Sequence, residues 1–247
     1  VGCTYDFMYN VDTAVFWGGN PSVSRIPDAH FVWEGKYNGA KIVVITPEFN
    51  ASARAADLWI PIKAGTDNLL AMSVIHTILK EKIYKPAFMK QFTDLSFLVN
   101  TKTGKMIRRT DMEHVDHKHH HKAEEEFYSM NAKTGKPALM PGTEGSDHKT
   151  LRLKEFGIDP QLEGTWKIKT NEGEVEVTTV FELLKAEAEK FSPEATRETT
   201  GVHPDTVRQL AHDLALPKVV EVTTGFSLNK YFNGILSIWN ISSILGL

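Results

Sequence analysis

The chain has 247 residues, of which 41% are hydrophobic and 24% charged, which is typical of a globular protein with enough material for one large domain or two small ones. A net charge of −3, with no basic stripe, argues against a broad nucleic-acid-binding surface, so no nucleic-acid partner is expected. The single cysteine, Cys3, excludes a disulfide framework and metal sites built from several cysteines of this segment.

The N-terminal part predicts a β-α-β unit. An apolar run over 11–16 ends at the turn Trp17-Gly18-Gly19-Asn20 and indicates a strand. A helix is expected from Pro27 to a C-cap at Gly39, and "KIVVITPE" (41–48) is typical of a strand buried on both faces. Because the connections are short, the two strands are expected to be parallel.

A third strand is expected at about 58–62, followed by a long helix whose N-cap is Thr66 or Asp67. In the last part, helices are expected over 179–191 and 203–215, with a further helix starting after Ser192. They precede a parallel-type strand in "KVVEVTTG" and a helix that opens after Gly225.

The middle of the chain is expected to be a hairpin-rich excursion. Glycine turns divide "FLVNTKTGKMIR", "FYSMNAKTGKPALM" and "TWKIKTNEGEVEV" into strand pairs. We therefore expect an α/β fold with a parallel, dinucleotide-binding-like sheet in 1–90, a variable hairpin region in 91–178 and a returning α/β segment in 179–247. The apolar sequence "GILSIWNISSILGL" at the C-terminus indicates an internal piece of a larger multidomain chain.

The turn after the first strand is a candidate ligand site. Gly18 and Gly19 allow backbone N–H groups to approach a phosphate, and Asn20 can bind a ligand or cap the turn. Glu48 follows the second strand, where nucleotide sites place a carboxylate for ribose hydroxyls. The full G-x-G-x-x-G pattern is absent, so a tight turn beside a surface glutamate remains an alternative.

Two other stretches carry open alternatives. In Gly65-Thr66-Asp67 the carboxylate can accept two N–H groups of a guanine edge, or can cap the helix. The histidines of the loop 114–121 could bind zinc, nickel or copper, whereas the adjacent lysines and the glutamates 124–126 favour a solvated loop. The histidines concerned are His114, His117, His119, His120 and His121.

Taken in order, four motifs in the stretch 16–79 resemble one family. They are "WGGN", "RIPDAHF" with the strand that ends at Glu48, "ADLW" and "GTD". This order resembles the molybdopterin oxidoreductases of the dimethyl-sulfoxide-reductase superfamily, and "FSPEATRETTGVHPDTVRQLAHDLA" and "KVVEVTTGFSLNKYFNG" are similar to later segments of that family. Within it, "RIPDAHF" and "TDLSFLV" resemble the nitrate reductase and nitrite oxidoreductase branch. The sequence of this stretch is most similar to that of nitrite oxidoreductase catalytic alpha subunits.

The resemblance implies a bis-(molybdopterin guanine dinucleotide) cofactor with molybdenum. Trp17, Gly18 and Asn20 would line one guanine dinucleotide, Glu48 would bind the ribose and Asp67 the guanine. The family more often has Asp at the position of Glu48, so the extra methylene moves this carboxylate outward. The full set of implied cofactor contacts is Trp17, Gly18, Gly19, Asn20, Thr46, Glu48, Gly65, Thr66, Asp67, Thr224 and Gly225, the last two near the pterin.

The resemblance also implies a function: oxidation of nitrite to nitrate by transfer of a water-derived oxygen atom at molybdenum, with electrons passed to iron–sulfur clusters. The molybdenum ligand and the ligands of a 4Fe–4S cluster are expected upstream of Val1, with no metal ligand among these residues. An iron–sulfur beta subunit, a haem-containing gamma subunit and a bacterial, periplasmic location with membrane association through partners are further expectations. The alternatives are a respiratory nitrate reductase or other enzyme of the branch, and a non-catalytic nucleotide-binding module with a His-rich metal loop.

Overall fold

The computed structural model describes residues 4–116, 119–145, 149 and 152–247. The chain divides into two compact units, one formed by Val1–Tyr84 with Ala188–Leu245 and the other by Lys85–Glu187 with Gly246–Leu247. The second unit therefore extends beyond the expected 91–178 region at both ends. That 1–90 and 179–247 share one cofactor-binding role stays a prediction.

The first unit is an α/β unit. Its elements are η1 (Tyr5–Asn10), β1 (Thr13–Trp17), α1 (Pro21–Ser24), α2 (Ile26–Tyr37), β2 (Lys41–Ile45), α3 (Ala51–Ala55), β3 (Leu58–Ile60), α4 (Asp67–Glu81), η3 (Glu189–Phe191), α10 (Pro193–Thr200), α11 (Pro204–Ala215), β9 (Val220–Thr224), η4 (Phe226–Lys230) and, for all but its last residue, α12 (Gly234–Gly246).

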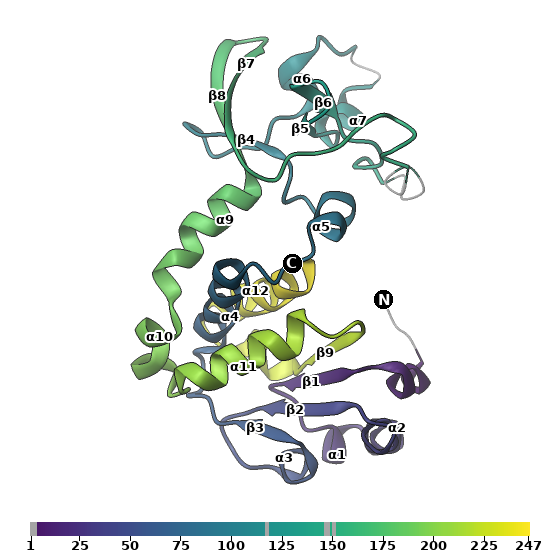
Figure 1. Ribbon diagram of the computed structural model, residues 1–247, viewed down its shortest axis with the longest axis vertical. Coiled ribbons are helices and arrows are strands. Elements are labelled where there is room, and N and C mark those ends of the chain that lie inside the picture. The colour runs from purple at the N-terminus through teal and green to yellow at the C-terminus, as the bar shows by residue number, and fades with distance from the viewer. Residues whose placement is uncertain (1–3, 117–118, 146–148, 150–151) are drawn as a thin grey trace. The chain divides into compact units, whose positions relative to one another are not determined.

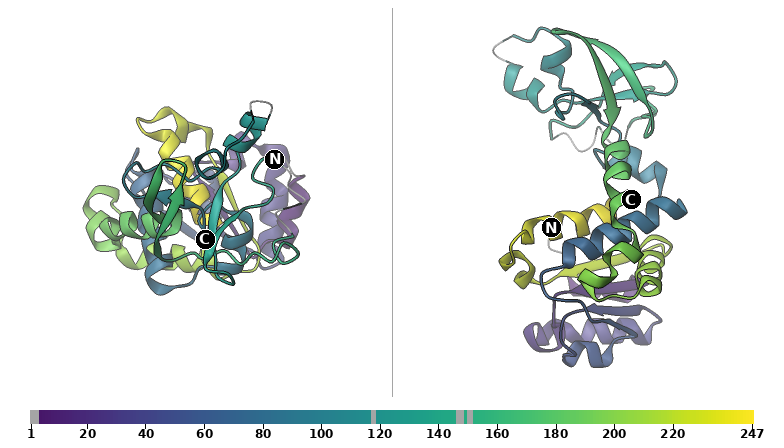
Figure 2. Two further views of the ribbon diagram at one scale, coloured as in Figure 1. Left: turned by 90° about the horizontal axis from the view of Figure 1, so that it is seen from above. Right: turned by 90° about the vertical axis from the view of Figure 1, so that its left-hand side faces the viewer.

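Four parallel strands form its sheet in the order β3-β2-β1-β9. Phe16 of β1 lies opposite Val44 of β2 and Thr223 of β9. α1, α2 and α3 cover one face, and α4, α11 and α12 lie on the other (Figures 1 and 2). The expected parallel pairing of the first two strands is confirmed, and β1 is buried along its whole length because helices cover both faces.

The two faces of the sheet have separate apolar cores. Phe16, Ile42 and Val44 pack with Val32 of α2 and Met8 of η1. Side chains of the alternate strand residues, such as the fully buried Trp17, point to the opposite face. Burying each large side chain of this kind stabilises the fold by about 1.5–3 kcal/mol, so the strands are held rigidly and their ends are fixed.

The prediction that a helix begins directly after Gly225 is wrong. A 3₁₀ segment, η4, ends at Lys230, and α12 begins only at Gly234. Asn233 adopts a left-handed conformation with φ of 62°, and a Cβ on Gly234 would lie 2.1 Å from the carbonyl oxygen of Leu228. The chain therefore turns tightly between the two helical segments, a feature that apolar periodicity does not encode.

The second unit is built from antiparallel strands. Its elements are α5 (Pro86–Phe92), β4 (Leu98–Asn100), α6 (Arg109–Met112), α7 (His120–Glu124), β5 (Tyr128–Asn131), β6 (Lys136–Leu139), β7 (Thr165–Thr170), β8 (Gly173–Thr179) and most of α9 (Val180–Ala188).

The hairpin predictions for this unit are confirmed, the first of them as a short antiparallel pairing. β5 pairs with β6, and β7 with β8. In the first expected hairpin, Val99 bridges Met106, and Asn100 N donates to the carbonyl of Lys105 over 2.9 Å. β4 also pairs with β8. Leu98, Ile107 and Val177 belong to a core of this unit's own. None of the described helices is both long and apolar enough to cross a lipid bilayer.

Candidate functional site

A cavity of about 360 Å³ lies at the carboxyl ends of the parallel strands of the first unit. Its walls come from the segments that follow β1, β2, β3 and β9, the place where open α/β sheets bind ligands. The lining residues are Gly18, Gly19, Asn20, Thr46, Pro47, Glu48, Asn50, Ala64, Asp67, Ser227, Leu228 and Tyr231. Six of them belong to the residues predicted from the sequence: Gly18, Gly19, Asn20, Thr46, Glu48 and Asp67.

Asp67 and Trp17 form the buried end of this site. Asp67 is 4% exposed, and Trp17 Nε1 donates a hydrogen bond of 2.8 Å to its Oδ1 atom. Burial raises the pKa of the Asp67 carboxyl group, and the indole N–H acts in the opposite direction because it stabilises the carboxylate. Trp17 is fully buried and is not among the residues that line the cavity, so it orients Asp67 rather than facing a ligand.

The structure separates the roles of Thr66 and Asp67. Thr66 occupies the N-cap position of α4, but its side chain makes no capping hydrogen bond; Oγ1 donates instead to the carbonyl of Lys63, 2.7 Å away. Asp67 is the first residue of the helix, where a carboxylate also interacts favourably with the helix dipole. The Asp67 side chain therefore lies within the cavity wall rather than at the N-cap.

Glu48 stands at the rim of the cavity. Its side chain is exposed, and no ion pair or hydrogen bond to its carboxylate is found among the described residues. Its backbone is fixed, because Thr46 Oγ1 donates to the carbonyl of Glu48 over 2.8 Å and Trp59 Nε1 donates to Thr46 over 3.2 Å. This free carboxylate on a held loop is able to accept hydrogen bonds from ligand hydroxyls.

The turns after β1 and β9 meet backbone to backbone. Gly225 N donates to the carbonyl of Trp17 over 2.7 Å, and a Cβ on Gly225 would lie 1.8 Å from the carbonyl oxygen of Gly18. Gly18 itself has φ of 70°, in the left-handed region that favours glycine. A Cβ on Gly19, in contrast, would meet no atom within 4 Å. Gly18 and Gly225 thus shape the turn, whereas Gly19 keeps ligand space open.

A neighbouring cavity of about 440 Å³ shares Gly19 and Asn20 with the first. It extends along the ends of β1 and β9 and includes Thr224, Gly225 and the exposed cation Arg25. Strand order reverses between β1 and β9, which is the switch point where α/β sheets bind dinucleotides. Thr224 and Gly225 thus line this second cavity and not the first.

Asn20 is held between the two cavities. Ser52 Oγ donates to Asn20 Oδ1 over 2.7 Å, and the same hydroxyl oxygen accepts the N–H of Ser22 at 3.0 Å. Among the described residues no partner is found for the Asn20 amide nitrogen, which remains able to donate. The sequence left open whether Asn20 binds a ligand or caps the turn. Its backbone carbonyl accepts the first hydrogen bonds of α1, its side chain makes no capping hydrogen bond, and its side-chain amide stays available to a ligand.

Sequence reasoning missed half of the lining of the first cavity. Pro47, Asn50 and Ala64 adjoin predicted motifs and could have been found by extending them. The other three, Ser227, Leu228 and Tyr231, come from η4 and the turn after it. The sequence predicted one continuous helix over this segment. Gly65 has φ of 80°, in the left-handed region that favours glycine, and a Cβ there would be in ordinary contact with Tyr231 Cδ1 at 3.5 Å.

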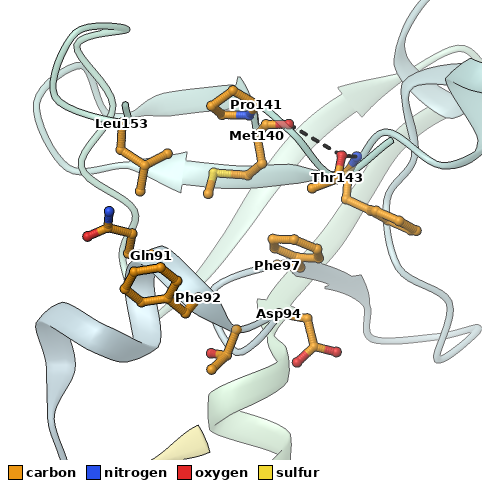
Figure 3. Close-up of a pocket in the computed structure, with 10 residues that line it drawn as sticks. Gln91, Phe92, Asp94, Phe97, Met140, Pro141, Thr143 and Leu153 are labelled. Atoms are coloured by element: carbon orange, nitrogen blue, oxygen red, sulfur yellow. Dashed lines mark hydrogen bonds between the residues drawn. The ribbon is translucent and has the colours of Figure 1, made fainter. Parts of the chain in front are cut away.

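The second unit holds a cavity of different character, with a volume of about 540 Å³ (Figure 3). Phe92, Phe97, Met140 and Leu153 give it mainly apolar walls, and the carboxylate of Asp94 points away from these side chains in the close-up (Figure 3). No predicted site residue lines this cavity, and it offers no charged group converging on one point. It is therefore not the candidate site.

The His-rich loop lies in the second unit, and His117 falls outside the described residues. His120 lies 3.5 Å from Glu124, and the side chain of His121 is fully exposed. Within the part of the chain that the structure describes, no three histidine, cysteine or acidic side chains gather closely enough to hold a metal ion. Whether the whole loop is solvated or binds metal stays a prediction.

The first unit fits one arm of the implied dinucleotide cofactor. Asp67 offers a carboxylate acceptor to a base edge, Glu48 a free carboxylate to ribose, and Gly19 an open backbone at the junction of the two cavities. Arg25 adds a cation in the second cavity, suited to a phosphate charge. These groups are of the kinds that bind a base, a ribose and a pyrophosphate.

Comparison with known proteins identifies relatives of this chain. The model of the molybdopterin oxidoreductase family matches residues 2–187. The chain is 41% identical over 244 residues to dimethylsulfide dehydrogenase subunit alpha of Rhodovulum sulfidophilum and 42% identical over 231 residues to chlorate reductase subunit alpha of Ideonella dechloratans. These alignments cover 99% and 94% of the chain but only 26% and 24% of the relatives.

Two further similarities extend the comparison. The respiratory nitrate reductase subunit alpha of Haloferax mediterranei is 32% identical over 92% of the chain and 23% of its own length. Among solved structures, acetylene hydratase from Pelobacter acetylenicus shares the fold with a TM-score of 0.57 at 13% identity, over 98% of this chain and 23% of that one. The chain thus spans about a quarter of the length of the relatives it matches.

Proposed function

Since the chain belongs to the molybdopterin oxidoreductase family, we propose that it is part of the catalytic subunit of a molybdenum oxidoreductase and binds one arm of a bis-(molybdopterin guanine dinucleotide) cofactor. The observation that carries the proposal is the buried Asp67 carboxylate, oriented by Trp17 at the end of the sheet and facing a cavity with Glu48 at its rim. A buried carboxylate needs donors, and the N–H groups of a guanine edge supply them.

Each residue of the site has a defined task in this proposal. Asp67 accepts the guanine N–H groups, Glu48 accepts the ribose hydroxyls, and the Gly19 backbone with Arg25 faces the phosphates. These contacts orient the cofactor and exclude water from the base. The bound group supplies two-electron oxygen-atom-transfer chemistry, and the protein supplies orientation and electrostatics.

For the substrate we propose nitrite, oxidised to nitrate with a water-derived oxygen atom. The support is the resemblance of "RIPDAHF" and "TDLSFLV" to the nitrate and nitrite branch, together with the chlorate reductase and nitrate reductase relatives. A respiratory nitrate reductase shares the same site plan. Identities of 41% and 42% favour dimethyl sulfide oxidation or chlorate reduction as second candidates.

The remaining expectations concern the longer protein. The relatives described above are alpha subunits, which supports a complex with an iron–sulfur beta subunit. A haem-containing gamma subunit, a 4Fe–4S cluster held by residues beyond this segment and an extracytoplasmic, periplasmic location are proposed with it.

The test is molybdenum and GMP per chain in the native protein, measured by elemental analysis and by chromatography after acid hydrolysis. One molybdenum atom and two GMP per catalytic subunit are expected. A folded, intact protein without molybdenum and GMP would contradict the proposal. Initial rates with nitrite, nitrate, chlorate and dimethyl sulfide, each with an artificial electron acceptor or donor, then decide the substrate.

A further inference from the structure

Tyr231 lines the same cavity as Asp67 and Glu48, and no motif of the sequence marks it. Among the described residues of the cavity wall it is the aromatic one. We propose that Tyr231 is the stacking wall for the guanine base whose edge Asp67 binds. This inference rests on the proposed function and adds a binding residue to it.

The backbone fixes the position of Tyr231. Its N–H donates to the carbonyl of Leu228 at 3.4 Å, and its own carbonyl accepts the N–H of Gly234 at 2.9 Å. The left-handed Asn233 and the close approach of Gly234 to Leu228 prevent α12 from starting earlier. The tight turn after η4 therefore holds Tyr231 at the cavity.

The ring also reaches the loop that presents Asp67. Tyr231 Cδ1 lies 3.5 Å from the position of a Cβ on Gly65, two residues before Asp67. A Cβ at this position would make ordinary van der Waals contact with the ring, so the ring packs close to the turn that leads into α4. The aromatic face and the carboxylate are thus presented side by side, one from the segment after β9 and the other from the segment after β3.

The two groups meet different parts of a base. A carboxylate accepts hydrogen bonds from the edge of guanine, whereas an aromatic ring covers a face. Tyr231 is 41% exposed, so its ring has surface to offer, and no hydrogen bond to its hydroxyl is found in the described part of the chain. The face of the ring, rather than the hydroxyl, is therefore the binding element.

The neighbouring residue provides a matched control. Phe232 is 93% exposed and is not among the residues that line the cavity. Tyr231→Phe keeps the aromatic face, Tyr231→Leu removes it, and Phe232→Leu removes an aromatic ring that does not face the ligand. If the leucine variant does not fold, Tyr231→Gln removes the face with a polar side chain of similar length.

The experiment is a calorimetric titration of the full-length catalytic subunit, prepared free of cofactor, with GDP as the probe. Tyr231→Leu is expected to weaken GDP binding by roughly ten- to a hundredfold, as loss of base–aromatic stacking does. The dissociation constant of Tyr231→Phe for GDP is expected to stay within about threefold of the wild-type value. Phe232→Leu is expected to bind GDP as the wild type does. Circular dichroism and melting temperature check that each variant is folded.

Two results would overturn the inference: GDP binding by the folded leucine variant at wild-type strength, or an equal loss in the leucine and phenylalanine variants, which would assign the effect to the hydroxyl. Failure of the proposed function looks different. In that case the wild-type protein as isolated contains neither molybdenum nor GMP, whatever residue stands at 231.

Discussion

Asp67 is a carboxylate in a position that water hardly reaches, at the start of α4 and under the indole of Trp17. One hydrogen bond from Trp17 offsets only part of the cost of burying a charge. Such a group destabilises the empty fold unless a ligand brings further donors. This is the pattern of a binding residue kept at the expense of stability.

Replacement of Asp67 by Asn tests this trade-off. The amide oxygen still accepts the Trp17 N–H, but the buried charge is gone. Because burial raises the pKa of Asp67 in the folded state, ionisation costs stability as pH rises from the ordinary carboxyl range towards the folded pKa. In the cofactor-free subunit, the Asn variant is therefore expected to melt higher than wild type at pH 7, and the difference is expected to disappear below about pH 4.

In the same variant the GMP content of the loaded enzyme is expected to fall at least about tenfold. The amide oxygen is hydrogen-bonded to Trp17, and the NH2 group that replaces the second carboxylate oxygen is a donor, so it does not accept a guanine N–H. An Asn variant that melts lower at pH 7 and retains its GMP would reduce Asp67 to a structural helix residue.

Trp17→Phe tests the orienting role of the indole. It removes the N–H donor and leaves the Asp67 carboxylate less satisfied, so the free energy of unfolding is expected to fall by about 2–3 kcal/mol, with a loss of GMP. Urea denaturation and acid-released GMP are the two measurements. Trp239→Phe, at an exposed position on α12, is the control and is expected to change neither. Equal effects of the two substitutions would show that Trp17 does not orient Asp67 for ligand binding.

At this scale the sequence predicts charged and glycine residues better than aromatic ones. Glu48 and Asp67 were predicted because each follows a strand within a motif, and the structure brings both to one cavity. Trp17 was predicted to line the cofactor but orients Asp67 from the core. Tyr231 was not predicted, because a tyrosine between two helical segments carries no local signal.

At the scale of elements, the parallel strands were predictable and the connection after β9 was not. Continuous β-branched runs and short connections specify β1 and β2 and their pairing. The interruption between η4 and α12 depends on the left-handed Asn233 and on contact between Gly234 and Leu228. These are tertiary constraints, so the quarter of the cavity wall that this segment contributes, Ser227, Leu228 and Tyr231, could not be predicted from the sequence.

The two glycine turns give a matched pair of substitutions. Gly225→Ala places a Cβ 1.8 Å from the carbonyl oxygen of Gly18, so the turns after β1 and β9 must separate. A loss of about 3 kcal/mol or more in unfolding free energy is expected, at the upper end of the cost of overpacking. Gly19→Ala meets no atom within 4 Å and is expected to leave stability within about 0.5 kcal/mol while lowering GMP content.

Thermal unfolding of the cofactor-free subunit measures the first effect, and nucleotide analysis of the loaded enzyme measures the second. A stable Gly225→Ala variant would show that the two turns can move apart, and an unchanged GMP content in Gly19→Ala would place the ligand elsewhere.

At the scale of the whole molecule, the two units have separate cores, and the predicted site residues all belong to the first. The chain leaves this unit after Tyr84 and returns at Ala188, whose carbonyl accepts a hydrogen bond of 2.9 Å from His76 Nδ1 on α4. Both crossing points therefore adjoin the same helix.

Replacement of residues 85–187 in the full-length subunit by a glycine-serine linker of about ten residues is expected to leave the first unit folded, because such a linker spans roughly 30 Å and the exit and return points are both held by α4. Retention of GMP within about twofold of wild type, with a cooperative melting transition, is the expected result. A matched excision of 85–200 also removes α10 and is expected to abolish folding. Loss of folding in both would show that the first unit needs the second.

The residues that line the cavity lie far apart in the sequence, and this has a consequence for biosynthesis. Asp67 and Glu48 are translated early, whereas Leu228 and Tyr231 follow about 160 residues later, a delay of roughly 8–30 s at ordinary elongation rates. During that time β1 lacks the neighbour that β9 becomes, and its hydrogen-bonding edge is open on the ribosome. Under the proposed function, we therefore expect the cofactor to be inserted into this cavity only after residue 231 has been synthesised, because only then is the cavity wall complete.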